Sequence, residues 1–225
     1  MIKLSKRLKV IADMVDNTNV LADIGCDHAL LDIYLLNNNI IKKSIACDIT
    51  EGALKQAKIN IKKYNVKNIE TRLSDGLNEI TYEDKIDTIV MSGLGDYKII
   101  NILNNNLEKL KNVSEIIIQS NTGVKNIREY MQSINYNILD EKLIKEKDII
   151  YTVIKFIKGR KKYSKKELLY GPLLMNSNDD LYGELLTNMM DKNNKIINNI
   201  PKYMIKKKIM LLIENKKIKK QLQKK

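Results

Sequence analysis

The sequence has no tryptophan, one phenylalanine, one histidine, two prolines and nine glycines among its 225 residues. Its hydrophobic residues, 44% of the total, are therefore mainly aliphatic, which predicts a globular core of isoleucine, leucine, valine and methionine. No run of about 18 consecutive apolar residues occurs, and the first residues contain no long apolar segment. We therefore expect a soluble cytoplasmic protein that does not enter a membrane.

Cysteine is almost as scarce, because Cys26 and Cys47 are the two cysteines of the chain. Two cysteines cannot build a disulfide framework or a four-thiolate zinc site, so both are expected to be free thiols in a reducing compartment. A metal site made of Cys26, Asp27 and His28 is disfavoured, since neighbouring residues on one loop rarely supply a complete ligand set. We expect no bound metal.

Positive charge is distributed unevenly along the chain. Residues 1–157 contain 22 basic and 21 acidic residues, whereas residues 158–225 contain 18 basic and 6 acidic residues. Such asymmetry is typical of a module that binds a polyanion and is joined to a domain of ordinary charge, although a solvated lysine-rich tail is the alternative. We predict a main domain over residues 1–158 and a basic extension over residues 159–225.

The main domain alternates strand-like and helix-like segments. Residues 51–64 repeat apolar side chains at helical spacing, and Thr50 is a suitable N-cap for that helix. This β-α-β-α order predicts a mostly parallel sheet with helices on both faces. The five strand-like runs are residues 20–24, 44–49, 69–73, 86–91 and 115–119.

The order changes after residue 136. Residues 137–143 and 149–157 are two further β-rich runs around a charged turn, so an antiparallel hairpin should complete a seven-stranded α/β sheet of Rossmann-like type. Two amphipathic stretches then flank Pro201 and predict an antiparallel α-helical hairpin with a coiled-coil apolar seam. The residues expected in that seam are Leu181, Leu185, Met189, Ile196 and Ile200 before the proline, and Ile205, Ile209, Leu212 and Ile213 after it.

Residues 22–29 follow the first strand and precede a helix-like run, which is where a doubly wound sheet binds its ligand. Gly25 permits a tight turn against the ligand, and Asp23 and Asp27 suit a cation better than a phosphate. S-adenosylmethionine carries a sulfonium and an ammonium, and it fits this charge. A dinucleotide loop would need further glycines, so a nicotinamide-dependent oxidoreductase is the weaker interpretation.

Three further strand ends carry polar or small residues. Asp48 ends the second strand about 20 residues beyond the first loop, where a carboxylate can accept hydrogen bonds from ribose hydroxyls. Asp75 ends the third strand and is a candidate contact for an adenine amino group, and residues 92–94 allow close approach of cofactor and substrate. The predicted cofactor-binding residues are Asp23, Gly25, Asp27, His28, Asp48, Ile49, Asp75, Gly76, Ser92, Gly93 and Leu94.

Six short segments together resemble one family. Residues 4–8, 22–31, 74–76, 92–95, 119–121 and 171–172 are similar to the bacterial tRNA (adenine-N1) methyltransferases that act on position 22 of the D-arm. The resemblance covers essentially the whole chain, and residues 23–29 are its most specific part. It implies a class I methyltransferase domain with a C-terminal coiled-coil domain, which forms 1-methyladenosine in tRNA. The chain departs from the family pattern at Asp96, where glycine is usual, and at Ser120, where proline is usual.

The expected substrate contacts fall into two groups. Gln119 and Asn121 follow the fifth strand, and we assign their amides to the edge of the target adenine, with capping of the strand end as the alternative. A neutral adenine N1 needs no strong base, so near-attack geometry should supply most of the catalysis and His28 should order the glycine turn. The predicted tRNA-binding residues are Arg7, Lys158, Arg160, Lys161, Lys162, Lys206, Lys207 and Lys208.

The sequence leaves some alternatives open. Arg7 is suited either to bridging a carboxylate of the cofactor loop or to contacting an RNA phosphate. A methyltransferase that acts on another RNA site would have similar features, and so would a non-catalytic RNA-binding protein on the same scaffold, which Asp96 and Ser120 keep open. The expected partner is tRNA, held at its D-arm and elbow by a monomeric enzyme.

Overall fold

The structure is a computed structural model that describes residues 2–201 and 203–223, and it divides into two compact units, Met1–Gly171 and Pro172–Lys225. The first unit extends beyond the boundary predicted at residue 158, because the following segment packs on the sheet domain. The Tyr163 hydroxyl accepts a hydrogen bond from the backbone of Ile138 at 2.9 Å, and Arg128 donates to the Leu168 carbonyl at 3.1 Å.

The first unit contains all seven predicted strands, each within a few residues of its predicted bounds. The Thr50 side chain caps the predicted helix by accepting the N–H of Ala53. Short 3-10 helices η1 (Tyr82–Asp84) and η2 (Leu107–Asn112) lie in the connections. The elements follow the order α1 (Lys6–Met14), β1 (Thr18–Ile24), α2 (Leu30–Asn37), β2 (Ile41–Asp48), α3 (Glu51–Lys63), β3 (Ile69–Leu73), β4 (Thr88–Leu94), α4 (Asp96–Asn104), β5 (Glu115–Ser120), α5 (Val124–Ser133), β6 (Tyr136–Glu146), β7 (Ile149–Lys158) and α6 (Lys165–Tyr170).

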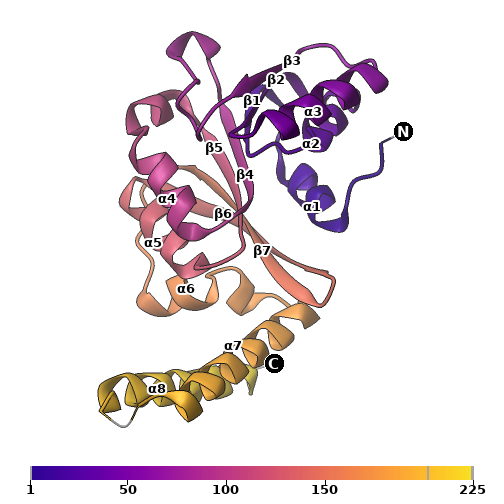
Figure 1. The fold of residues 1–225 in the computed structure, drawn as a ribbon. Coiled ribbons are helices and arrows are strands. Elements are labelled where there is room, and N and C mark those ends of the chain that lie inside the picture. Colours follow the sequence, from indigo (N-terminus) through magenta and orange to yellow (C-terminus); the bar gives the residue numbers. More distant parts are fainter. Residues whose placement is uncertain (1, 202, 224–225) are drawn as a thin grey trace. The chain divides into compact units, whose positions relative to one another are not determined.

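The strands form one twisted sheet in the order β3-β2-β1-β4-β5-β7-β6 (Figure 1). Neighbouring strands from β3 to β5 are parallel, whereas β7 is antiparallel to both β5 and β6. The chain therefore has the predicted mostly parallel sheet with a terminal antiparallel hairpin. The direction of winding reverses between β1 and β4, and sheets of this type bind ligands at the carboxyl ends of the strands beside such a reversal.

Helices cover both faces of the sheet (Figure 1), and an aliphatic layer lies between the sheet and the helices on each face. Along β5, Ile116 and Ile118 face a layer to which α4 contributes Ile99, whereas Ile117 faces a second layer to which α2 contributes Leu35. All five side chains are at most 1% exposed. Burial on both faces explains why this strand is an unbroken apolar run in the sequence rather than an alternating one.

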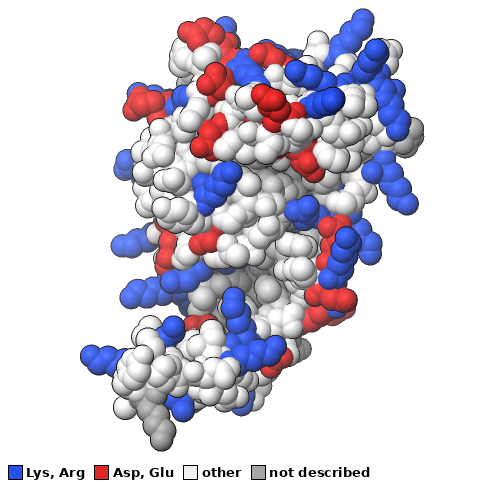
Figure 2. Space-filling model, in the orientation of Figure 1, with Lys and Arg blue, Asp and Glu red and all other residues white. Residues whose placement is uncertain are grey.

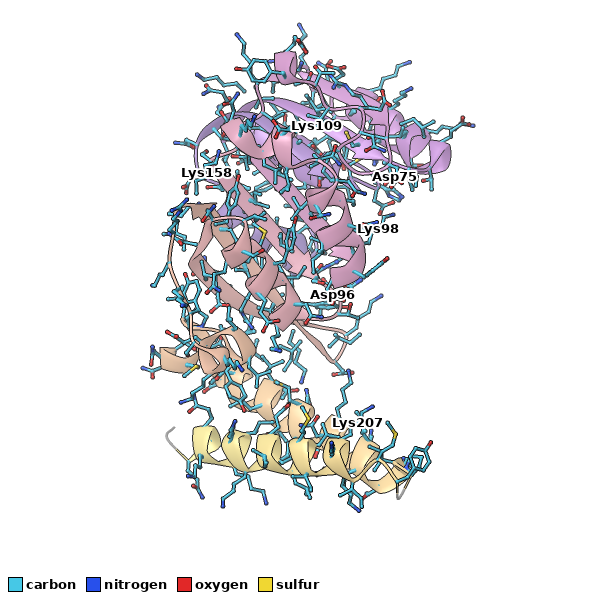
Figure 3. The ribbon with its side chains drawn as sticks, turned by 90° about the vertical axis from the view of Figure 1, so that its left-hand side faces the viewer. Asp75, Asp96, Lys98, Lys109, Lys158 and Lys207 are labelled. Carbon is cyan, nitrogen blue, oxygen red and sulfur yellow. The ribbon has the colours of Figure 1, made fainter. Side chains whose placement is uncertain are left out.

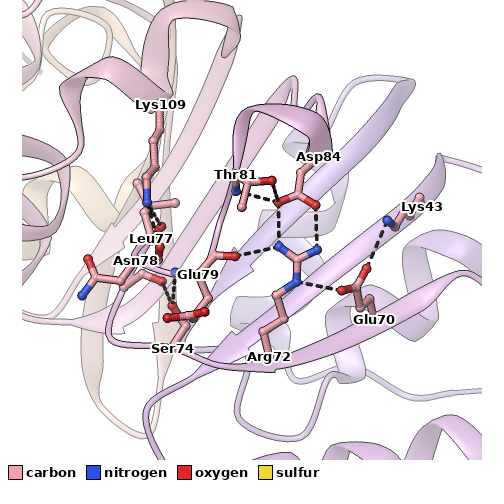
Figure 4. A network of polar contacts seen from close by, with 11 residues as sticks. Lys43, Glu70, Arg72, Ser74, Leu77, Asn78, Glu79, Thr81, Asp84 and Lys109 are labelled. Carbon is pink, nitrogen blue, oxygen red and sulfur yellow. Dashed lines mark hydrogen bonds and ion pairs between the residues drawn. The ribbon is translucent and has the colours of Figure 1, made fainter.

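A network of charged side chains fixes β3, the outermost parallel strand (Figure 4). The Arg72 guanidinium donates two hydrogen bonds of 2.6 Å to the Asp84 carboxylate and one of 2.8 Å to Glu70. Lys109 donates to two backbone carbonyls of residues 77–78 at 2.7 and 2.8 Å. These bonds hold the connection between β3 and β4 in one conformation, and this connection includes the loop that follows the carboxyl end of β3.

The second unit consists of η3 (Leu174–Asn176), α7 (Asp180–Asn199) and α8 (Ile205–Leu222), and the two long helices form the predicted antiparallel hairpin. Within it, the Asn193 amide donates to Asn215 at 3.0 Å, and Asn215 donates to Asn194 at 2.8 Å. Such buried amide pairs fix the register of paired helices. The predicted members of the seam on α7 are only partly buried. On α8 the predicted seam is wrong, because two helices cover only one side of each other and leave about half of the side chain exposed at Ile205, Ile209, Leu212 and Ile213.

Within the described ranges, none of the helices is long and apolar enough to cross a membrane.

Candidate functional site

A cavity of about 430 Å³ lies at the carboxyl ends of β1, β2 and β4, with α1 and α4 contributing to its wall. It brings together the predicted cofactor residues Asp23, Gly25, Asp27, His28, Asp48, Ile49, Gly76, Ser92, Gly93 and Leu94. Asp75 is exposed and lines a neighbouring hollow together with Tyr97 and Lys98. Sequence reasoning missed several residues of the wall, among them Leu8, Cys26, Leu31, Lys98 and Ile102.

The loop after β1 crosses the end of the neighbouring strand. The backbone N–H groups of Gly25 and Cys26 both donate to the Cys47 carbonyl, at 2.9 and 3.0 Å. Gly25 has a φ of +82°, and Asp27 and Ala29 both have a φ of 51°. Positive φ suits glycine but strains other residues, and such strain in ordered loops is concentrated at functional sites. The loop is therefore held against the cavity by its hydrogen bonds.

Asp48 is fixed at the end of β2. One carboxylate oxygen accepts the N–H and the hydroxyl of Thr50, both at 2.9 Å, and the other accepts the N–H of Asp27 at 3.2 Å. A carboxylate has about four lone-pair sites, so these bonds orient Asp48 and leave acceptor capacity for a ligand hydroxyl. The contact of Asp48 with ribose stays a prediction.

Asp23, at the wall of the cavity, has a buried carboxyl neighbour that the sequence did not reveal. Asp23 lines the cavity with 4% of its surface exposed, and its neighbour Asp32 on α2 is fully buried. Burial raises the pKa of both carboxyls, and the charge of Asp32 raises the pKa of Asp23 further. The signal in the sequence was a single carboxylate inside the apolar run of residues 29–36.

On the other side of the cavity, Gln119 organises the end of β4. Its carbonyl oxygen accepts from Arg7 at 2.6 Å, from the N–H of Gly93 at 3.0 Å and from the Ser92 hydroxyl at 3.2 Å. Its amide nitrogen donates to Asn121 at 3.0 Å, and Asn121 donates to the Gly93 carbonyl at 2.7 Å. Gln119 is fully buried and Asn121 is exposed. This geometry favours the capping role that was the alternative for Gln119.

Arg7 has partners within the first unit. Besides Gln119, its guanidinium lies 3.8 Å from the carboxylate of Glu146 and 5.5 Å from the centre of the Tyr151 ring. The carboxylate it pairs with therefore belongs to β6 and not to the cofactor loop. Arg7 lines the cavity, and its position ties α1 to the ends of β5 and β6.

Asp96 stands where glycine is usual in the family that the chain resembles, and its side chain is held away from the cavity. Its carboxylate accepts from the Thr122 hydroxyl at 2.6 Å and from the Asn126 amide at 2.7 Å. These bonds, the Thr122 bond above all, keep the pKa of Asp96 below its usual range. A methyl group on Gly123 would lie 1.9 Å from the Asp96 carboxylate, so the two positions are coupled. Asp96 begins α4, on which the cavity residue Lys98 also lies (Figure 3).

The predicted basic residues differ in their surroundings. The Lys158 ammonium donates to the carbonyls of Leu110, at 3.0 Å, and Lys111, so it caps η2. Basic side chains are spread over the face drawn in Figure 2, on both units. The remaining members of the predicted set beyond β7 are exposed, and they are Arg160, Lys161 and Lys162 on the first unit and Lys206, Lys207 and Lys208 on α8. Among the residues that the structure describes, no group of three or more His, Cys, Asp or Glu is placed to hold a metal ion.

The sheet order, the acidic glycine loop after β1 and the carboxylate at the end of β2 define a Rossmann-like protein of the class I methyltransferase type. The model of the tRNA (adenine(22)-N(1))-methyltransferase family matches residues 21–224. The chain belongs to this family.

Relatives agree with this assignment. The chain is 35% identical over 154 residues to the tRNA (adenine(22)-N(1))-methyltransferase of Bacillus subtilis, an alignment that spans 68% of the chain and 64% of that relative's length. The structure of M. capricolum TrmK in complex with S-adenosyl-homocysteine is 36% identical, with a TM-score of 0.87 over 98% of each chain. A Streptococcus pneumoniae protein in complex with S-adenosyl-L-methionine is 27% identical, with a TM-score of 0.90 over 98% of this chain and 100% of the other.

Proposed function

We propose that the chain transfers the methyl group of S-adenosylmethionine to N1 of adenine 22 in tRNA and so forms 1-methyladenosine. The observation that carries this proposal is the acidic cavity at the β1/β4 reversal in a chain that belongs to the tRNA (adenine(22)-N(1))-methyltransferase family. The M. capricolum relative, which carries the product form of this cofactor, is similar over 98% of each chain. We further propose that the enzyme acts as a cytoplasmic monomer on the D-arm and elbow of tRNA.

The side chains that line the cavity suit S-adenosylmethionine. Asp48 has acceptor capacity for the ribose hydroxyls, and Asp23 supplies negative charge for the ammonium. Ile49 and Leu94 offer apolar contacts for the adenine, and Asp75 at the rim is our candidate for its amino group. When bound, the cofactor supplies an electrophilic methyl group on its sulfonium.

The residues of the chain act mainly by positioning. The neutral N1 of adenine has a lone pair that attacks without a base, so the rate depends on bringing N1 and the methyl group into line at close range. The bonds of Gln119 to Arg7, Ser92 and Gly93 make the wall formed by residues 92–94 rigid. Asn121 is exposed, and its amide can form further hydrogen bonds besides those to Gln119 and Gly93, so it is our candidate for contacting the adenine edge.

We assign the binding of tRNA to exposed basic side chains. Lys206, Lys207 and Lys208 follow one another on α8, and Arg160, Lys161 and Lys162 follow β7. Their contacts with phosphates should make affinity fall steeply with salt. Remote binding energy of this kind can also be used to expose the target base, whose N1 is normally paired or stacked.

The test is incubation of the purified protein with methyl-labelled cofactor and unmodified tRNA, followed by nucleoside analysis. Formation of 1-methyladenosine in the parent tRNA, and its absence when adenine 22 is replaced by guanine, would establish the reaction and the position together. The matched variant Asp48→Asn removes one charge at constant shape, and it should weaken cofactor binding while the protein stays folded. Cofactor binding without transfer to any tRNA would instead favour a non-catalytic scaffold.

A further inference from the structure

Two carboxyl groups lie side by side beneath the cofactor loop. Asp23 is the last residue but one of β1 and lines the cavity, and Asp32, in the first turn of α2, is completely buried. The charge of Asp32 acts on Asp23 and raises its pKa, so the two side chains are neighbours. Two ionised carboxylates at this range repel each other strongly in a site that excludes water, whereas one shared proton turns the repulsion into a hydrogen bond.

The two oxygens of Asp32 have unequal surroundings. One accepts the hydroxyl of Ser44 on β2, whereas the other is buried and has no hydrogen-bond partner among the described residues. A buried acceptor without a donor is costly, and a proton on the carboxyl pair would supply the missing donor. Burial, which raises the pKa of both groups, acts in the same direction.

We propose that Asp32 is a positioning residue for Asp23, and that the pair shares one proton until a cationic ligand in the cavity drives that proton into solvent. A cation binds more tightly to the doubly ionised pair than to the protonated one, so binding and proton release are linked. The proton leaves the carboxyl pair, a buffer base accepts it, and no other bond changes. This inference rests on the proposed cofactor, S-adenosylmethionine, because its ammonium and sulfonium supply the cationic charge.

Other titratable groups surround the pair, and their proton exchange has to be distinguished from that of the pair. Burial raises the pKa of Cys47 to about 12 and that of Cys26 further, so neither thiol exchanges protons near neutral pH. His28 is the one histidine of the chain and lines the cavity. The His28→Gln substitution therefore removes any protons that histidine exchanges when the ligand binds. The charged groups that face the cavity around the pair are Asp27, Asp48, Arg7 and Lys98.

The experiment is calorimetric titration with S-adenosylmethionine between pH 6 and 8, in two buffers of different ionisation enthalpy, on the full chain and on Asp32→Asn. Each protein is also measured with His28→Gln. The wild-type affinity should rise with pH, by up to about tenfold per pH unit where a full proton is released, and the two buffers should report that release. Asparagine keeps the shape and accepts from Ser44, and it removes the second ionisable carboxyl, so Asp32→Asn should bind with a smaller pH dependence and release fewer protons than the wild type.

The three outcomes separate the shared proton from the proposed function. Equal pH slopes and equal proton counts in wild type and Asp32→Asn would overturn the shared proton. No release from the wild-type protein in either buffer would do the same without any variant, so the test does not depend on Asp32→Asn folding. A wild-type chain that fails to bind the cofactor at any pH would overturn the proposed function itself, and this inference with it.

Discussion

The two units carry their charges in opposite ways. In the first unit some charged side chains are buried in pairs, such as Arg128 and Glu141, whose side chains are 3% and 0% exposed and 2.7 Å apart. In the second unit Lys206, Lys207 and Lys208 are exposed on α8. Buried pairs fix geometry and make the fold sensitive to a single substitution, whereas exposed charges of one sign create a field that attracts polyanions. Substitutions in the buried pairs of the first unit should therefore change stability, and those of the exposed lysines on α8 should change tRNA affinity.

Arg128→Met should have the largest effect. It would leave the Glu141 carboxylate buried and remove the bond to the Leu168 carbonyl, so the free energy of unfolding should fall by about 3–5 kcal/mol in urea titrations. The matched control is Lys125→Met, which breaks the exposed Lys125–Glu129 pair and should cost less than about 1 kcal/mol. Equal losses would mean that burial does not determine how much an ion pair of the first unit contributes to stability.

Replacing Lys206, Lys207 and Lys208 together by glutamine should weaken tRNA binding and leave cofactor binding unchanged. The slope of log affinity against log salt should decrease by about 0.9 for each phosphate that is no longer neutralised, as measured by filter binding at several salt concentrations. The matched control replaces three exposed lysines of α3, Lys55, Lys58 and Lys62, by glutamine. If both triple variants lose the same affinity, net charge rather than the hairpin surface determines binding.

Gly123→Ala tests the coupling between the loops that follow β4 and β5. Its methyl group would meet the Asp96 carboxylate at 1.9 Å, and the φ of +54° disfavours alanine, so a loss of about 1–3 kcal/mol is expected in thermal unfolding. The double variant Asp96→Gly, Gly123→Ala removes the clash and should recover part of the loss. A double variant as unstable as Gly123→Ala alone would contradict the coupling.

Asp84→Asn should have the smallest effect, and that effect depends on pH. Arg72 holds the pKa of Asp84 below its usual range, so the ion pair contributes stability above the unfolded-state pKa of about 4 and loses it as pH falls. The variant should be less stable than wild type by about 1 kcal/mol at pH 7, and the difference should shrink below pH 4 in urea titrations. A difference that is constant with pH would show that the pair does not act through ionisation.

The sequence predicted the strands, and it predicted that most of the candidate cofactor residues lie together at one cavity, for one physical reason. A parallel sheet buries both faces of its strands, so runs of β-branched residues are visible as strands, and the polar residues after them gather at one edge. Asp48 and Gly25 could be located in this way. Asp32 could not, because its role depends on a neighbour that only the packing of α2 brings close.

Some features of the structure could not be predicted from the sequence, and the reasons are physical. The apolar residues in the first half of α8 have helical spacing, but a two-helix hairpin offers no second surface to bury them. The orientation of the Gln119 side-chain amide depends on its hydrogen bond to Arg7. Arg7 lies 112 positions earlier in the chain, so the local sequence around Gln119 does not reveal this bond. The extension of the first unit to Gly171 depends on side chains such as Tyr163, whose partner lies in β6.

The position of β7 has a consequence for synthesis of the chain. All six residues of β5 are buried, and the neighbour on its second edge is β7, the last strand to be made. Until the ribosome has released residues up to Lys158, that edge of an isoleucine-rich strand has no partner and can pair with another nascent chain. The time taken to translate residues 121–158 therefore determines how long the growing protein is exposed to aggregation.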